Sequence, residues 1–341
     1  MGTNPGVKVQ IRSLYKIFGP DAAAMTEHVE AGISKEDLLD KHAHVLGLRN
    51  INLDVAAHQV QVIMGLSGSG KSTLIRHINR LIEPTAGEVI VDGEDILAMT
   101  PLELRQFRRS KASMVFQGFA LLPHRTVADN VAYGLSVQGI DKAEREERGK
   151  RWIDRVGLTG YEGYYTTHLS GGMRQRVGLA RALATDAEIL LMDEPFSALD
   201  PLIRTDMQDI LLGLQTELHK TIIFITHDLD EALRIGNSIA ILRDGEAVQV
   251  GTPQDIIMRP ADGYVAEFIK DINRGRVIQV ASIMDAEKAD GGPKVDAETV
   301  LDDALQLMIG SGSDIATVTR NGEPAGSVRL ESIATALAKP D

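Results

Sequence analysis

The sequence predicts an α/β protein built on a parallel sheet with helices on both faces. From Gly65 onward, helical segments alternate with short apolar segments. Two of these, EILLMDEP and TIIFITHD, are continuous apolar runs of strand length, as in strands buried on both faces. A glycine-rich loop, GLSGSGKST, stands between a predicted strand and a predicted helix. This alternation is typical of the α/β class.

The N-terminal part predicts strands with a helical segment between them. The stretches VKVQIRSLYKIFG, INLDV and QVQVIMG have the polar and apolar alternation of half-buried strands. The intervening PDAAAMTEHVEAGISKEDLLDKHAH is helical in character. Ser34 is a candidate N-cap, and Asp37, three residues later, is its capping-box partner.

The remaining segments predict further helices and a separate C-terminal part. Residues 119–169 are expected to be mostly helical, with the charged run DKAEREERGKRW as a solvated helix face and Trp152 as a packing residue. After about Asn273, DAEKADGGPKVD is a predicted polar linker. The stretch that follows predicts helix, strand, a turn at NGEP, strand and helix.

The length and composition of the chain exclude several classes of protein and of functional site. The 341 residues suit two domains, or one large domain with an appendage. The formal net charge of −12 argues against a general attraction to nucleic acid or anionic lipid. The lack of cysteine excludes disulfides, thiolate zinc sites and cysteine nucleophiles. Because no apolar run has the length of a signal peptide core or a membrane span, work at a membrane is expected to require a partner.

The loop GLSGSGKST has the spacing of a phosphate-binding loop. Its glycines let the backbone curl so that N–H groups and a helix N-terminus face phosphate oxygens. Lys71 is expected to reach the β- and γ-phosphates of a nucleotide, and Ser72 to place its hydroxyl on Mg²⁺. The predicted nucleotide-binding residues of the loop are Gly65, Ser67, Gly68, Ser69, Gly70, Lys71, Ser72 and Thr73.

Two adjacent carboxylates end the apolar strand ILLMDEP. Asp193 is expected to bind in the Mg²⁺ shell, because a hard cation takes oxygen ligands. Glu194 is a candidate base for the attacking water. Such a pair alone could also be a solvated strand end, and it becomes a hydrolytic site only together with the phosphate loop.

Three other candidates each have an alternative. Gln117 in MVFQGF could contact the metal and the water, or could be an ordinary polar loop residue. His227 after TIIFIT could sense the γ-phosphate, although a lone histidine there is more often structural. Phe18 in YKIFG could stack on adenine or belong to the core.

The ordered set GLSGSGKST, VFQ, LSGGMRQR, LLMDEPFSALD and ITHD resembles the ATP-binding subunits of ABC transporters, from about Val7 to Gly251. The resemblance implies that two copies pack head to tail, with Ser170, Gly171 and Gly172 binding the γ-phosphate held by the other copy. It makes Lys71, Glu194 and the switch histidine His227 catalytic. It assigns Ser72, Gln117 and Asp193 to Mg²⁺, and Asp200 to a loop that communicates across the dimer.

The resemblance also implies a domain organisation. Residues 1–272 would form a P-loop NTPase (RecA-like) ABC nucleotide-binding domain with an antiparallel β subdomain, a helical subdomain at about 118–170 and an insertion at about 21–44. Residues 273–341 resemble one small α+β CBS-like repeat, regulatory or dimerising. The stretch GSVRLES lacks the Thr and Asp that often contact adenosine phosphates, which weighs against a ligand there.

Finer similarity is to the quaternary-amine importers for glycine betaine, proline betaine and choline, through YKIFG, GISKEDLLDKH, NRLIEPTAG and FSALDPLIRTDMQ. It implies integral membrane permease subunits and a periplasmic or lipid-anchored solute-binding protein as partners, and a peripheral position on the cytoplasmic face of the bacterial inner membrane. The alternatives are import of another polar solute such as an amino acid, an ABC ATPase of DNA repair or translation, and a regulatory adenosine-binding module.

Overall fold

The computed structural model describes residues 6–286 and 291–338. The chain divides into two compact units, residues 1–228 with 235–248 and residues 229–234 with 249–341. Within the described ranges, no helix combines the length and apolar character that crossing a bilayer requires.

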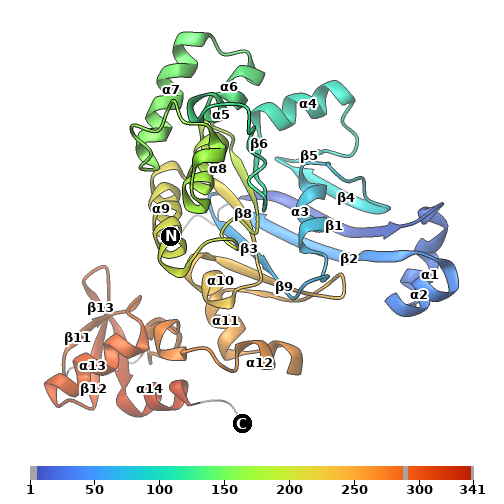
Figure 1. The fold of residues 1–341 in the computed structure, drawn as a ribbon. Helices are drawn as coiled ribbons and strands as arrows, with labels where there is room; N and C mark the ends of the chain where they lie inside the picture. Colours follow the sequence, from blue (N-terminus) through green and yellow to red (C-terminus); the bar gives the residue numbers. More distant parts are fainter. Residues whose placement is uncertain (1–5, 287–290, 339–341) are drawn as a thin grey trace. The chain divides into compact units, whose positions relative to one another are not determined.

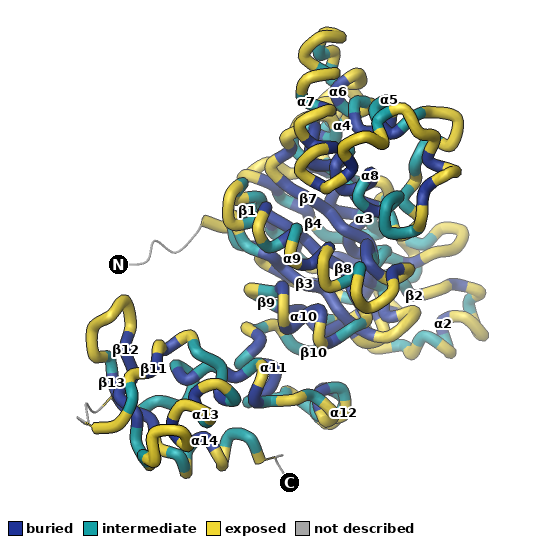
Figure 2. Tube along the Cα trace, turned by 60° about the vertical axis from the view of Figure 1, so that its left-hand side comes forward, coloured by how far each residue is buried: buried dark blue, intermediate teal, exposed yellow. Residues whose placement is uncertain are grey.

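A six-stranded sheet forms the centre of the first unit (Figure 1), and its strand order is β10-β9-β3-β8-β7-β6. The pairs β3–β8, β3–β9, β7–β8 and β6–β7 are parallel, as the apolar runs predicted. Every residue of β3, β7 and β8 is buried, and Figure 2 shows the buried trace concentrated there. The strands are β3 (Val60–Met64), β6 (Ala112–Val115), β7 (Ile189–Asp193), β8 (Thr221–Thr226), β9 (Ser238–Arg243) and β10 (Glu246–Gly251).

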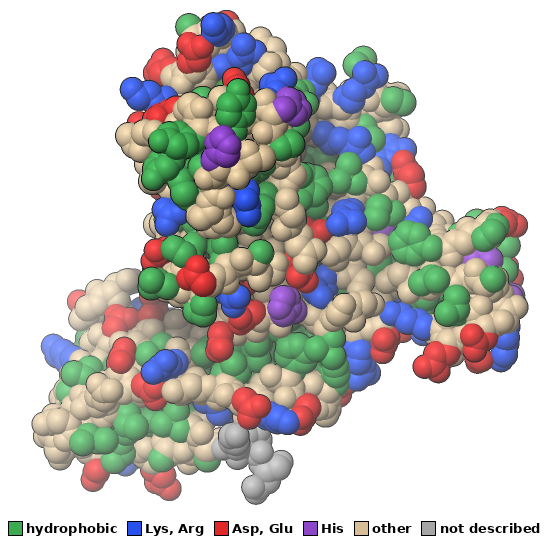
Figure 3. Space-filling view, viewed as in Figure 1, with side chains coloured by type: hydrophobic (Ala, Val, Ile, Leu, Met, Phe, Trp, Pro, Cys, Tyr) green, Lys and Arg blue, Asp and Glu red, His purple; other side chains and the backbone are tan. Residues whose placement is uncertain are grey.

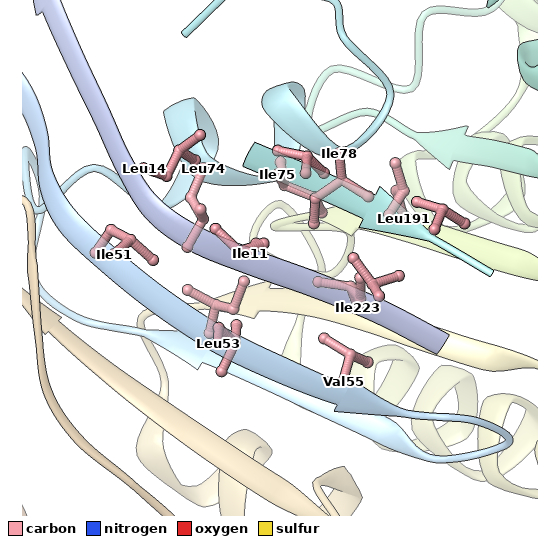
Figure 4. Packing of buried hydrophobic residues seen from close by; sticks show 14 of the residues in the cluster. Ile11, Leu14, Ile51, Leu53, Val55, Leu74, Ile75, Ile78, Leu191 and Ile223 are labelled. Atoms are coloured by element: carbon pink, nitrogen blue, oxygen red, sulfur yellow. The ribbon is translucent and has the colours of Figure 1, made fainter. Parts of the chain in front are cut away.

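A second, antiparallel sheet has the order β2-β1-β4-β5. Its strands are β1 (Val7–Phe18), β2 (Val45–Ala56), β4 (Ala86–Val91) and β5 (Glu94–Asp95). Side chains of β1 and β2 meet those of helix α3 (Lys71–Ile78) and of the central sheet in one apolar core (Figure 4). Ile11, Leu53, Leu74 and Ile223 are among its buried members, so the two sheets and α3 are packed as one body.

The insertion between β1 and β2 folds as predicted into short helices, η1 (Ala22–Met25), α1 (Thr26–Glu30) and α2 (Lys35–His42). The Ser34 hydroxyl accepts a hydrogen bond from the Asp37 N–H at 3.0 Å, which confirms the N-cap. A small apolar cluster joins these helices to the ends of β1, β2 and β4. Its buried members are Tyr15, Ile17, Val29, Leu38 and Leu46.

The helices α5 (Val127–Val131), α6 (Tyr133–Gln138), α7 (Lys142–Arg155) and η2 (Thr166–His168) confirm the predicted helical segment. On α7, Lys142 pairs with Glu146 and Arg148 with Glu144, one turn apart. Figure 3 shows acidic and basic side chains interspersed at the top of the view, where Figure 1 places α7. Trp152 is 9% exposed, in agreement with a packing role. The remaining helices of this unit are α4 (Pro101–Ser110), α8 (Gly171–Ala184) and α9 (Pro201–Leu218).

The second unit contains a three-stranded sheet of order β11-β12-β13. Helix α13 (Leu301–Ser311), β12 (Ile315–Arg320), β13 (Glu323–Arg329) and α14 (Leu330–Leu337) occur in the predicted order. This unit also contains α11 (Pro253–Met258), α12 (Gly263–Ile269), η3 (Arg274–Arg276), η4 (Val280–Ser282), β11 (Lys294–Asp296) and most of α10 (Leu229–Ile235).

The main segment of the second unit begins at Gln249, before the composition change near Asn273. Arg274 donates hydrogen bonds to the carbonyls of Ile257 (3.4 Å) and Ala336 (2.8 Å), so α11 and α14 are joined to the same residue. Residues 287–290 of the predicted polar linker lie outside the described residues.

Helix α3 contains a fully buried histidine. His77 Nδ1 donates to the Thr73 carbonyl at 2.6 Å, while its Nε2 has no hydrogen-bond partner within residues 6–286 and 291–338. Burial lowers the pKa of His77 to about 4, because the imidazolium cannot be solvated there. The folded state therefore contains neutral His77, and the unfolded chain takes up the proton at the ordinary pKa near 6.5.

We expect the contribution of His77 to stability to be complete above pH 6.5 and to be lost as the pH falls toward about 4. The largest loss corresponds to roughly 3 kcal/mol. His77→Leu should flatten this part of the stability curve, measured by denaturant unfolding between pH 7 and 4.5. The exposed His124 provides the control His124→Gln, and an equal flattening by both would contradict the assignment.

Candidate functional site

The loop between β3 and α3 has the backbone form that the glycine spacing predicts. Gly65, Gly68 and Gly70 have φ values of 150°, 80° and 102°. A Cβ at Gly65 would lie 2.2 Å from the Leu242 carbonyl oxygen, because the loop passes directly against the end of β9. Ser67 and Gly68 are exposed, and Thr73 is half-buried one turn into α3. The loop therefore presents bare backbone at a helix N-terminus, where an anion binds well.

Lys71 is buried at the base of this loop, with 5% of its surface exposed. Its ammonium group donates to the carbonyls of Gly65 (2.8 Å) and Leu66 (3.0 Å). Burial lowers the pKa of Lys71, and the carboxylates of Glu194 and Asp193 oppose that shift. The loop thus has a cation beneath it, directed toward the region where the predicted phosphates would bind.

The Ser69 hydroxyl is buried and has no hydrogen-bond partner among the described residues. A buried polar atom without a partner is unfavourable, and a phosphate oxygen would satisfy it. Together with the glycine backbone, this observation fits the binding of a nucleotide phosphate.

Asp193 ends β7 and is 1% exposed. Its Oδ1 accepts a hydrogen bond from Ser72 Oγ at 2.7 Å, and its Oδ2 lies 3.2 Å from an Arg76 guanidinium nitrogen. The two predicted metal ligands Ser72 and Asp193 are therefore adjacent, with oxygen atoms that suit Mg²⁺. Arg76 was missed in the sequence, although its position one helical turn after Ser72 was the available signal.

Glu194 lies among three other predicted site residues. Its Oε2 accepts from Gln117 Nε2 at 3.0 Å and lies 3.4 Å from His227 Nδ1, and its Oε1 is 3.9 Å from Lys71 Nζ. Glu194 has a left-handed φ of 44°, which is uncommon outside glycine and is found at strained functional positions. The structure thus brings Lys71, Gln117 and His227 around one carboxylate.

Phe18 lies at the end of β1 and is 39% exposed, so its alternative as a core residue is wrong. Lys16 Nζ lies 4.9 Å from the ring centroid. Gly47 of β2 packs against the same ring, because a Cβ there would be 2.7 Å from Phe18 Cε2. The exposed Phe18 ring agrees with stacking on a base, and this role stays a prediction.

The LSGG and SALD segments lie beside one another at the starts of two helices. Ser170 caps α8 by accepting from Met173 N at 3.3 Å, and Asp200 caps α9 by accepting from Ile203 N at 3.1 Å. A Cβ at Gly172 would lie 2.7 Å from Ile203 Cγ2, so the helix starts touch. The hydrogen bonds described around Glu194 do not include Ser170, Gly171, Gly172 or Asp200. Their roles across a dimer stay predictions.

A family model described as ABC transporter matches residues 48–197, which include the phosphate loop, Gln117, Ser170 and the two carboxylates. Over 339 residues the chain is 47% identical to the glycine betaine/proline betaine transport system ATP-binding protein ProV of Escherichia coli (strain K12), covering 97% of this chain and 83% of that protein. The chain belongs to the ABC transporter ATP-binding proteins. It is accordingly an ATP-binding ABC ATPase, as the motifs predicted.

Other relatives of this ABC ATPase include the glycine betaine transport ATP-binding protein OpuAA of Bacillus subtilis (strain 168), 50% identical over 94% of this chain and 76% of that protein. The trimethylamine N-oxide transport system ATP-binding protein TmoW of Ruegeria pomeroyi is 44% identical over 97% of each chain. The solved dimer of the ATP-binding cassette MJ0796 with ADP and Pi has 31% identity and a TM-score of 0.62, covering 72% of this chain and 98% of that one.

We predict that Gly65→Ala lowers the affinity for ATP more than tenfold. The new Cβ would meet the Leu242 carbonyl at 2.2 Å, and overpacking of this kind costs about 1–3 kcal/mol. The control is Gly68→Ala, which shares the positive φ and its backbone strain, but whose Cβ would meet no described atom within 4 Å. Fluorescence titration with an ATP analogue should separate the two variants, and equal affinities would contradict the close-approach argument.

Proposed function

We propose that this ABC ATPase hydrolyses ATP to power a membrane importer of quaternary amine osmolytes, namely glycine betaine, proline betaine or choline. The arrangement of Lys71, Gln117 and His227 around Glu194 carries the hydrolytic part of the proposal. The relatives named for glycine betaine transport, at 47% and 50% identity, support the solute class. The relative named for trimethylamine N-oxide supports that amine oxide as the competing solute.

The chain's own residues would divide the work of hydrolysis. Loop amides and Lys71 bind the phosphate chain and stabilise the charge that develops on it. Glu194 accepts a proton from the attacking water, and the Gln117 amide and His227 hold the carboxylate in place. Ser72, Asp193 and Gln117 are the proposed ligands of Mg²⁺, which neutralises phosphate charge when bound.

A second copy of the chain is proposed to complete each site. Ser170 is exposed at the start of the 14-residue helix α8, with Gly171 and Gly172 adding backbone amides without side chains. In a head-to-tail dimer, this helix start would cover the γ-phosphate bound by the other copy. The neighbouring Asp200 segment would then sense closure, so ATP binding stabilises the dimer and hydrolysis releases it.

The proposed assembly includes integral membrane permease subunits and a periplasmic or lipid-anchored solute-binding protein, with this chain peripheral on the cytoplasmic face of the bacterial inner membrane. The relatives ProV and OpuAA are named as transport ATP-binding proteins, which supports permease subunits as partners. Residues 1–272 are proposed as the nucleotide-binding domain and residues 273–341 as one CBS-like repeat that regulates or dimerises. The β-strand and helix order of the second unit supports that likeness.

The test is uptake of radiolabelled glycine betaine, proline betaine, choline and trimethylamine N-oxide by cells that lack only this subunit. We expect uptake of at least one quaternary amine to be lost and to return with the wild-type gene but not with Lys71→Ala. If only trimethylamine N-oxide uptake were lost, this amine oxide would replace the quaternary amines as the proposed solute. Unchanged uptake of all four would overturn it.

Glu194→Gln should lower the rate of ATP hydrolysis about 10²–10⁴-fold, because it removes the general base, while ATP binding persists. The variant should then accumulate as an ATP-bound dimer in size-exclusion chromatography. Adding Ser170→Arg should return it to monomer, since the exposed cap would be blocked. Hydrolysis at the wild-type rate by Glu194→Gln would contradict the assignment of the base.

A further inference from the structure

The insertion between β1 and β2 positions a lysine at the outer edge of the phosphate loop. Its apolar cluster holds α1 and α2 against the ends of β1 and β2, so the insertion is packed in place. The Ser34 cap starts α2 at Lys35, the first residue of the helix. Figure 1 shows α1 and α2 at one end of the antiparallel sheet. The Lys35 side chain is 28% exposed, which means that most of its length is covered.

Lys35 connects two segments that are distant from it in the sequence. Its Nζ lies 3.5 Å from the carbonyl oxygen of Gly68 in the phosphate loop and 3.7 Å from Asp244 Oδ1 in the turn between β9 and β10. That turn also touches the loop, since Gly245 N–H donates to the Ser69 carbonyl at 3.1 Å. The ammonium group therefore lies between the exposed edge of the phosphate loop and the turn that supports it.

A second contact holds the same corner together. The backbone N–H of Arg49 donates to the Gly245 carbonyl at 2.8 Å, and its guanidinium pairs with Glu246 at 2.9 Å. The same guanidinium donates to the Ile33 carbonyl, two residues before Lys35. Arg49 thus joins the segment before α2 to the β9–β10 turn independently of Lys35. Lys35 therefore adds a contact between parts that are already held in place.

We propose that Lys35 is a positioning residue that holds the phosphate loop in its ATP-binding conformation and so couples the insertion to nucleotide affinity. Gly68 has a φ of 80°, and in the described part of the chain no atom beyond its chain neighbours lies within 4 Å of the position that a Cβ would occupy. The loop is therefore open on that side, and the Lys35 hydrogen bond contacts it at the Gly68 carbonyl. A loop held in its bound form before ATP arrives loses less conformational entropy on binding.

This inference rests on the proposed ATPase activity, and its experiment separates the two. The full-length chain is compared as wild type, Lys35→Met, which keeps the apolar stem, and Lys35→Arg, which keeps the charge. The control is Lys41→Met on the same helix, because Lys41 pairs with Asp37 at 3.0 Å, one turn away, and is 64% exposed. Wild-type protein that neither binds nor hydrolyses ATP would overturn the proposed function itself.

We expect Lys35→Met to raise KM for ATP roughly threefold to fivefold with kcat within twofold of wild type, as suits loss of one long hydrogen bond of modest strength. Lys35→Arg should keep KM near the wild-type value because it retains the charge, and Lys41→Met should leave KM unchanged. Asp244→Asn, which weakens the other contact of Lys35, should raise KM in the same direction.

Amide hydrogen exchange without nucleotide gives a readout independent of activity. Exchange at Gly68, Ser69 and Gly70 should be faster in Lys35→Met than in the wild type and in Lys41→Met. Equal exchange and equal KM in Lys35→Met and Lys41→Met would overturn the inference. A raised KM that Lys35→Arg does not rescue, with a lowered Tm, would also overturn it, because the lysine would then act only in folding.

Discussion

The site depends on the reversal of the chain between Asp193 and Glu194. β7 delivers Asp193 into an enclosed position, where Ser72 and Arg76 satisfy its carboxylate. The left-handed φ of 44° at the next residue turns Glu194 toward Gln117 and His227 instead. Two neighbouring carboxylates therefore have different surroundings, which suits the different uses proposed for them, one for a metal ion and one for a proton.

The packing of the two sheets makes this arrangement rigid. Ile11 and Leu53 from the antiparallel sheet meet Leu74 of α3 and Ile223 of the central sheet in one core (Figure 4). Helix α3 is thereby fixed from both sides, and its first residue is the buried Lys71. Positioning of this kind matters because phosphoryl transfer depends on fixed charges and little on covalent chemistry by the protein.

The insertion shows how an addition outside the two sheets can act on a site within them. Its helices have an apolar cluster of their own, so they are held without help from the nucleotide site. Lys35 at the start of α2 reaches the loop through the carbonyl of Gly68. In the role proposed for Lys35, a single polar contact changes nucleotide affinity without altering the residues around Glu194, which leaves the chemical step and its control separable.

Local sequence determined the phosphate loop, the strands of the central sheet and the Ser34 cap, because each depends on neighbours a few residues apart. Only the tertiary structure decided that Gln117 reaches Glu194, which lies 77 residues later, and that Lys35 reaches Gly68. It likewise decided that Phe18 is exposed, since alternation at a strand end suits either face equally. Side chains that meet although they come from separate strands and turns leave no local pattern in the sequence. Sheet pairing and core packing set the distances between them.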